Sequence, residues 1–180
     1  KELYSRGADV TLIMGPTQLA FSANGVNLVN VTTADEMYDV CINKFEQTDI
    51  TIMAAAVADY TPINKADEKI KKKEGSLNVE LTKTKDILKA LGEKKKKGQI
   101  LVGFALETNN EEAYANQKLK EKNADLIVLN SLNDTGAGFG YDTNKITIFE
   151  RGGKVFKFET KSKSEVAKDI IDTITQLYYA

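Results

Sequence analysis

The stretch Ile100-Leu-Val-Gly-Phe-Ala-Leu106 decides the fold of this chain. Apart from Gly103, all of its side chains are apolar, and Leu126-Ile-Val-Leu129 is a second run of the same kind. Strands that are buried on both faces have this composition, because helices cover both sides of a parallel sheet. Further short runs with the composition of strands precede these two, at residues 10–14, 26–31 and 50–54.

Helical stretches separate these strand-like runs. Thr33 is a typical helix-capping residue. Asn109 followed by Glu112 resembles a capping box. The alternation of strands and helices predicts a doubly wound, mostly parallel Rossmann-like α/β sheet with right-handed crossovers. The segments predicted to be helical are residues 34–45, about 110–123 and 164–179.

Two segments depart from the plain alternation. Residues 146–149 and 155–158 alternate in period two around Arg151-Gly-Gly-Lys154, which predicts a C-terminal antiparallel hairpin on the edge of the sheet. Residues 60–85 follow a strand but have no long helical face. We therefore expect a single domain over residues 1–180, with residues 60–85 as an insertion.

The composition excludes several classes of function. The chain has 180 residues, 42% of them hydrophobic, and 25 basic against 26 acidic side chains give a formal charge of -1. It has no histidine and one cysteine, Cys41, so internal disulfides, Ser/His triads and histidine acid–base chemistry are excluded. No apolar run approaches the ~20 residues that span a bilayer. We expect a cytoplasmic protein that makes no membrane contact.

Small residues follow the strand predicted at 50–54. Ligands of open α/β sheets bind beyond the carboxyl ends of the strands, and Ala54, Ala55 and Ala56 lie at such an end. Their small side chains let a ligand approach the backbone, and Asp59 follows closely. Close packing explains the alanines equally well, and aspartate is common in turns. The sequence of this motif leaves both interpretations open.

Two groups of lysines are candidates for phosphate binding. Lys69 begins a lysine-rich run in the inserted segment, where a movable loop could bring charge to a bound nucleotide. Lys118 and Lys122 share one face of the helix predicted over residues 110–123. Both patterns also fit solvent-exposed lysines, and Phe104 is most simply a core residue. The chain has no P-loop, and its lysine runs contain no aromatic residue, which disfavours nucleic-acid binding.

Five motifs follow one another over nearly the whole chain: Ala54-Ala-Ala-Val-Ala-Asp-Tyr60, Glu68-Lys-Ile-Lys-Lys72, Gly103-Phe-Ala-Leu-Glu-Thr-Asn-Asn110, Lys118-Leu-Lys-Glu-Lys122 and Gly138-Phe-Gly-Tyr-Asp-Thr-Asn144. Together they resemble bacterial phosphopantothenoylcysteine synthetase, the synthetase part of the coenzyme A biosynthesis bifunctional flavoproteins. Each motif is modest by itself. Five motifs in the same order make the resemblance specific.

The resemblance implies a CTP-dependent ligase that joins 4'-phosphopantothenate to L-cysteine in coenzyme A biosynthesis, with Mg²⁺ as the divalent ion. The carboxylate attacks the α-phosphate of CTP and forms an acyl-cytidylate, and the cysteine amine then displaces CMP. Charge develops on phosphate oxygens, so electrostatic stabilisation by lysines suits this chemistry. The resemblance also implies a homodimer and, in many bacteria, a flavin-dependent decarboxylase fused upstream.

The family's functional residues transfer to individual positions of this chain. Lys69 matches the lysine that binds the triphosphate and is the expected catalytic residue. Residues 60–81 match the dimer contacts, so residues 60–85 are expected to form a flexible loop and dimerisation segment. The resemblance identifies no metal ligands. The expected nucleotide-binding residues are Ala54, Ala55, Ala56, Asp59, Lys69, Lys83, Thr84, Lys85, Phe104, Lys118 and Lys122.

The chain departs from the family at three places. The family's Lys-x-Pro-Asp is here Lys83-Thr-Lys-Asp86, so the turn lacks the fixed φ of proline and gains a charge. An Asn-Asp pair of the family is here Asn130-Ser131. Family members begin with a strand and a glycine-rich turn, whereas this sequence starts in the helix that follows them. We expect little or no amide formation from these 180 residues alone.

Two alternatives remain open from the sequence. One is a related ligase that uses ATP in place of CTP, because Asp59 and Phe104 do not reveal which base is bound. The other is a noncatalytic module that binds a nucleotide or nucleic acid through the lysine runs. Oligonucleotide affinity that falls steeply with salt would indicate the second alternative.

Overall fold

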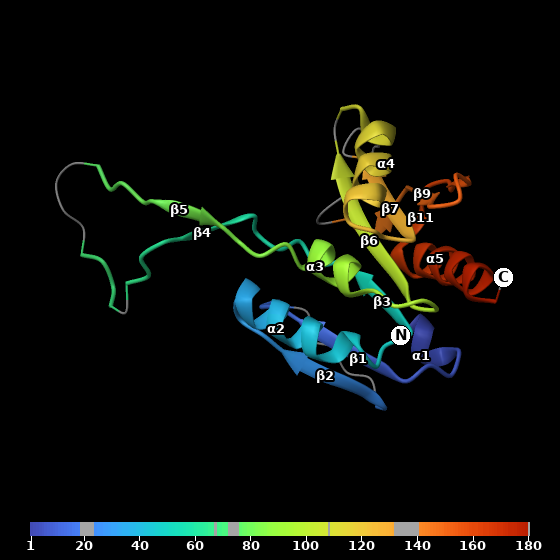
Figure 1. The fold of residues 1–180 in the computed structure, drawn as a ribbon, viewed down its shortest axis with the longest axis horizontal. Helices are drawn as coiled ribbons and strands as arrows, with labels where there is room; N and C mark the ends of the chain where they lie inside the picture. Colours follow the sequence, from blue (N-terminus) through green and yellow to red (C-terminus); the bar gives the residue numbers. More distant parts are fainter. Residues whose placement is uncertain (19–23, 67, 72–75, 108, 132–140, 180) are drawn as a thin grey trace.

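The predicted apolar strands form the centre of a five-stranded sheet (Figure 1). In the computed structural model, β3 (Ile50–Met53), β6 (Ile100–Glu107) and β7 (Leu126–Ser131) are parallel. β9 (Ile146–Glu150) and β10 (Val155–Lys157) extend the sheet antiparallel, which confirms the predicted hairpin. The strand order is β10-β9-β7-β6-β3.

The structure describes residues 1–18, 24–66, 68–71, 76–107, 109–131 and 141–179. The first residues of the motif at 138–144 therefore lie outside the described part of the chain, as do Lys72 and Lys73 of the lysine-rich run. Among the described residues, no helix is both long enough and apolar enough to cross a bilayer.

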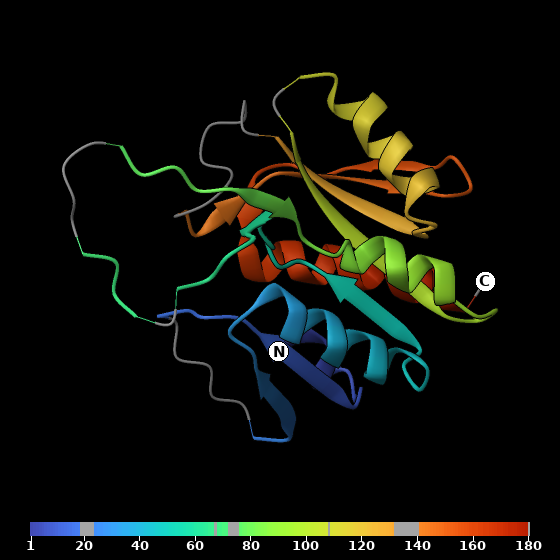
Figure 2. The ribbon, with the colours of Figure 1, turned by 60° about the vertical axis from the view of Figure 1, so that its left-hand side comes forward.

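Helices cover both faces of the five-stranded sheet (Figure 2). Side chains alternate along β6, so Leu101 and Ala105 join the core cluster under α2, α3 and α4, whereas Val102 joins the cluster under α5. This arrangement confirms the doubly wound, mostly parallel α/β fold. The helices are α2 (Ala34–Phe45), α3 (Ile87–Lys94), α4 (Glu111–Glu121) and α5 (Lys163–Tyr178).

A second, two-stranded sheet lies apart from the first. β1 (Val10–Met14) pairs in parallel with β2 (Val26–Asn30). Among the described residues β1 is not paired with β3, so each is an edge of its own sheet. All four residues of β3 are only partly buried, although three of them are apolar. Edge strands carry unpaired backbone N–H and C=O groups, so β1 and β3 present two open edges.

The described residues of the segment 60–85, which we name the arm, extend away from the five-stranded sheet and from the β1–β2 sheet (Figure 1). At its base, β4 (Tyr60–Pro62) pairs antiparallel with β5 (Leu81–Lys83). We did not predict this pair, because three-residue strands are too short to show a period. Exposed apolar patches mark interaction surfaces, but the dimerisation assigned to the arm stays a prediction. The exposed apolar side chains of the arm are Tyr60, Ile63, Ile70, Leu77, Val79 and Leu81.

The helix starts confirm one sequence signal and correct another. Thr33 caps α2, because its Oγ1 accepts a hydrogen bond from the Glu36 backbone N–H at 3.1 Å. The capping box predicted at Asn109 is wrong: Asn110 precedes α4 and its side chain makes no capping bond. A capping residue needs an extended backbone, whereas Asn110 has a left-handed φ of 48°. The box instead lies at Ser162 and starts α5.

Three short elements complete the fold. α1 (Glu2–Ser5) packs on α5, where Arg6 Nη1 lies 2.6 Å from Asp172 Oδ1. β8 (Thr143–Asn144) pairs antiparallel with β11 (Lys161–Ser162) in a further two-stranded sheet that leads into α5.

Candidate functional site

The carboxyl ends of β3 and β6 bring two predicted site segments together. Met53, the last residue of β3, pairs with Gly103 in β6, so Ala54 and Phe104 are the next residues along two neighbouring parallel strands. Ala54, Ala55 and Ala56 are all exposed. Close packing within this chain therefore does not explain these alanines. They form an open surface of small side chains at the edge where α/β sheets bind ligands.

The base of the arm lies against the segment that follows β3. Thr84 Oγ1 donates to the Ala58 carbonyl oxygen at 2.6 Å, and the Thr84 backbone N–H donates to the Asp59 carbonyl oxygen at 2.9 Å. In the β4–β5 pair, Lys83 lies opposite Tyr60. These bonds place Lys83 and Thr84 beside Asp59, as the predicted site requires.

Helix α4 and the residue that follows it bring the two predicted lysines to the same region. Lys118 Nζ donates to the carbonyl oxygen of Phe104 at 2.9 Å. Lys122 Nζ pairs with Asp86 Oδ2 at 2.7 Å. Asp86 ends the segment Lys83-Thr-Lys-Asp86, which the resemblance places beside the base and ribose, and its place before an apolar helical run also signals a helix cap. The two lysines thus link the end of α4 to β6 at Phe104 and to the start of α3 at Asp86.

Lys85 is directed toward helix α2. Its Nζ lies 3.2 Å from Asp35 Oδ1 and 4.9 Å from the centre of the Tyr38 ring. The hydrogen bond with Asp35 raises the pKa of Lys85. Both side chains of this ion pair are more than half exposed, so the pair adds little stability. Its effect is to tie the turn between β5 and α3 to α2.

Lys69 is separated from the other predicted site residues within this chain. It is exposed and belongs to the segment between β4 and β5, whose described residues extend away from the five-stranded sheet (Figure 1). The structure therefore gathers Phe104, Lys118 and Lys122 but does not bring Lys69 to them.

A polar cluster that we did not predict lies at the end of β7. The Ser131 hydroxyl donates to Glu111 Oε1 at 2.5 Å, and Asn144 Nδ2 donates to Asn130 Oδ1 at 3.1 Å. Ser131 and Asn144 are buried. Glu111 thus supplies a carboxylate at the strand end where the family's acid is replaced by Ser131. Among the described residues, no group of three acidic or cysteine side chains is placed to hold a metal ion.

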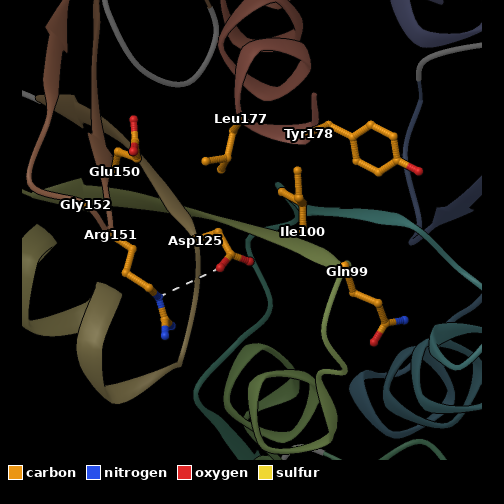
Figure 3. Close-up of a pocket in the computed structure, with 9 residues that line it drawn as sticks. Gln99, Ile100, Asp125, Glu150, Arg151, Gly152, Leu177 and Tyr178 are labelled. Atoms are coloured by element: carbon orange, nitrogen blue, oxygen red, sulfur yellow. Dashed lines mark ion pairs between the residues drawn. The ribbon is translucent and has the colours of Figure 1, made fainter. Parts of the chain in front are cut away.

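A cavity of about 410 Å³ lies at the opposite, amino-terminal edge of β6 and β7 (Figure 3). Its central carboxylate is already satisfied: Asp125 Oδ1 accepts from Lys95 Nζ at 2.6 Å and Asp125 Oδ2 accepts from the Leu101 backbone N–H at 2.8 Å. Arg151 donates to the Ala124 carbonyl oxygen and lies 3.8 Å from Asp125. These bonds make the cavity floor a structural network.

This network gives a stability prediction. We expect Asp125→Ala to lower the free energy of unfolding by about 2 kcal/mol, because it leaves the Lys95 ammonium without its ionic partner. The Lys95 side chain is only 10% exposed. Glu46→Ala removes the partner of the neighbouring Lys96, whose side chain is 59% exposed, and should cost less than about 0.5 kcal/mol. Equal losses in urea unfolding would contradict this account.

Taken together, the fold and the carboxyl-edge cluster define a class: a doubly wound α/β domain with a candidate ligand site at the carboxyl ends of its parallel strands. A family model, "DNA/pantothenate metabolism flavoprotein C-terminal domain", matches residues 1–178. The chain belongs to this family.

Relatives of known name support the assignment of the chain to this family. The chain is 46% identical over 171 residues to the coenzyme A biosynthesis bifunctional protein CoaBC of Bacillus subtilis, covering 95% of this chain and 42% of the relative. It is 50% identical over 173 residues to a cysteine/cysteine sulfinic acid decarboxylase of an unknown prokaryotic organism, covering 96% and 48%. The chain thus spans about half the length of these curated relatives.

A solved structure shares the fold over nearly the whole chain. The crystal structure of the C-terminal domain of CoaBC matches with a TM-score of 0.81 and 38% identity, covering 98% of this chain and 78% of that one. The resemblance that the sequence motifs indicated is therefore confirmed, and the motifs that carry it lie in the region this chain shares with CoaBC.

Proposed function

We propose that this chain is the synthetase part of a coenzyme A biosynthesis protein and joins 4'-phosphopantothenate to L-cysteine with CTP. The observation that carries the proposal is the cluster of Phe104, Lys118 and Lys122 beside the exposed alanines 54–56. Family membership and the likeness to the CoaBC domain support it.

The proposed reaction has two displacements. A carboxylate oxygen of 4'-phosphopantothenate attacks the α-phosphorus of CTP, the bond to the bridging oxygen breaks, and pyrophosphate leaves. The cysteine nitrogen then attacks the acyl carbon, the bond to the CMP oxygen breaks, and the nitrogen loses a proton as the amide forms. Both steps build charge on phosphate oxygens, so fixed cations lower their barriers.

Each predicted residue has a role in this proposal. Lys118 and Lys122 bind the nucleotide with Phe104 beside them, and Ala54, Ala55 and Ala56 form the open surface on which it lies. Asp59, Lys83 and Thr84 border the same surface from the base of the arm. Lys85 contributes indirectly: its side chain pairs with Asp35 and so helps to fix the turn between β5 and α3.

Lys69 reaches the nucleotide by one of two routes in this proposal. The arm folds back over its own sheet edge, or it extends across a homodimer to the partner's site. The exposed apolar side chains of the arm, such as Leu77 and Leu81, support the dimer. Mixing Lys69→Ala protein with Lys118→Ala protein tests the second route: restored activity would place Lys69 in the partner's site, and its absence would favour folding back.

Among the described residues, no group of three or more acidic or cysteine side chains could hold a metal ion. We therefore assign Mg²⁺ to the nucleotide, as part of the CTP substrate, and assign no metal ligand to this chain. The proposed partners are otherwise small molecules, together with the flavin-dependent decarboxylase that the length of the relatives suggests.

The choice of CTP over ATP is tested by titration calorimetry of the full-length protein that contains this chain. We expect CTP to bind more tightly than ATP in the presence of Mg²⁺. Tighter ATP binding would overturn the choice of nucleotide and leave the ligase chemistry in place. Binding of neither nucleotide would contradict the proposed function.

The 180 residues alone should show little amide formation. Among the described residues, β1 and β3 are edge strands of two separate sheets, so the sheet that carries the candidate site is not continuous with β1 and β2. Amide formation assayed with protein of 19.9 kDa tests this expectation. Turnover equal to that of the full-length protein would contradict it.

A further inference from the structure

One carboxylate joins the start of α3 to the end of α4. Asp86 Oδ1 accepts a hydrogen bond from the Lys89 backbone N–H at 2.9 Å and so caps α3. Asp86 Oδ2 accepts from Lys122 Nζ at 2.7 Å. Lys122 follows the last residue of α4. The two helices that flank the candidate site are thus held together at this one side chain.

The backbone of Lys122 is fixed as well. Asn123 Nδ2 donates to the Gly92 carbonyl oxygen at 2.7 Å. The approach of α4 to α3 is so close that a Cβ at Gly92 would lie 1.8 Å from the Lys122 carbonyl oxygen. The Lys122 side chain is 19% exposed. The ammonium of Lys122 is therefore restrained at both ends of its flexible stem.

The charge of Asp86 favours this arrangement at neutral pH. Burial raises the pKa of Asp86, but the hydrogen bonds from Lys122 and Lys89 outweigh it and lower the pKa below its ordinary value. The carboxylate stays ionised and keeps its bond with Lys122. An ammonium has three N–H donors, and Asp86 occupies one of them. Within the described part of the chain, Asp86 is the one acceptor of the Lys122 ammonium, so two of its donors remain for a ligand.

We propose that Asp86 is a positioning residue for Lys122 in nucleotide binding. This inference rests on the proposed function. By holding the ammonium before the nucleotide arrives, Asp86 removes most of the entropy loss that a free lysine would suffer on binding. The ammonium of Lys118 is held by a backbone group instead, because it donates to the Phe104 carbonyl oxygen. Both nucleotide lysines are thus set in place by protein oxygens.

Asp86→Asn separates positioning from helix capping. Asparagine is as good a capping residue as aspartate, so the start of α3 is kept while the charged partner of Lys122 is lost. We expect the Kd for CTP to rise about tenfold, with the KM for CTP raised more than kcat is lowered. Lys122→Met should weaken binding further, and adding Asp86→Asn to it should cause no additional loss.

The control variant is Ser162→Ala, which removes the side-chain cap of α5 on the other face of the sheet. It should lower Tm without changing the Kd for CTP. Asp86→Asn protein that binds CTP as tightly as the wild type, or losses that simply add in the double variant, would overturn the positioning role alone. Wild-type protein that binds no nucleotide would overturn the proposed function and with it the role of Asp86.

Discussion

Replacing Lys69 by alanine should lower the kcat of pyrophosphate release from CTP about 100- to 1000-fold. The cause is the loss of a cation from the triphosphate, where charge develops as the bond to pyrophosphate breaks. Groups that act only in the transition state lower kcat and kcat/KM together. Steady-state assays of the full-length protein with saturating 4'-phosphopantothenate measure both quantities.

The matched control is Lys65→Ala. Lys65 lies in the same part of the arm, four residues before Lys69, and is also exposed. Its loss removes one charge from the arm without removing the proposed triphosphate ligand, so kcat should change less than about threefold. Equal losses in the two variants would show that only the overall charge of the arm matters. Full activity of the Lys69→Ala protein would show that Lys69 is not a catalytic residue.

Gly92→Ala should lower the free energy of unfolding by about 3 kcal/mol and Tm by about 10 °C. In an ordinary helix this substitution stabilises, by about 1 kcal/mol. Here the new Cβ would lie 1.8 Å from the Lys122 carbonyl oxygen. A backbone atom cannot rotate away, so α3 and α4 must move apart. Thermal and urea unfolding measure the loss, and CTP binding should weaken with it.

Gly153→Ala provides the comparison for this prediction. Gly153 has a φ of +92°, but a Cβ there would meet no atom within 4 Å. Its replacement should cost about 1 kcal/mol through backbone strain alone. A stabilised Gly92→Ala variant, or one no worse than Gly153→Ala, would show that the α3–α4 contact is looser than the structure indicates.

The centre of the fold was predictable because burial leaves a direct mark on the sequence. The runs at 100–106 and 126–129 are apolar on both faces, and they became β6 and β7. The β4–β5 pair was not predictable, because its strands have three residues each and are defined by pairing across the arm. Asn110, the residue before α4, likewise has a left-handed backbone, which no spacing pattern reveals.

The candidate site was predictable as a set of residues but only in part as an arrangement. The helical spacing of Lys118 and Lys122 placed both on one face, and the structure brings that face to Phe104 and Asp86. The pairing of Asp86 with Lys122 and the place of Glu111 were missed, because the partners of both residues are distant in the sequence. The expected role of Lys69 stays a prediction, since a long exposed segment has few contacts to fix where it lies.

The most direct test of the proposed ligase measures pyrophosphate released by the full-length protein from CTP and Mg²⁺, with and without 4'-phosphopantothenate and cysteine. The intact mass of the same sample identifies the protein assayed. We predict release that requires both CTP and 4'-phosphopantothenate, followed by amide formation when cysteine is added. A folded full-length protein that released no pyrophosphate from CTP or ATP would contradict the ligase function.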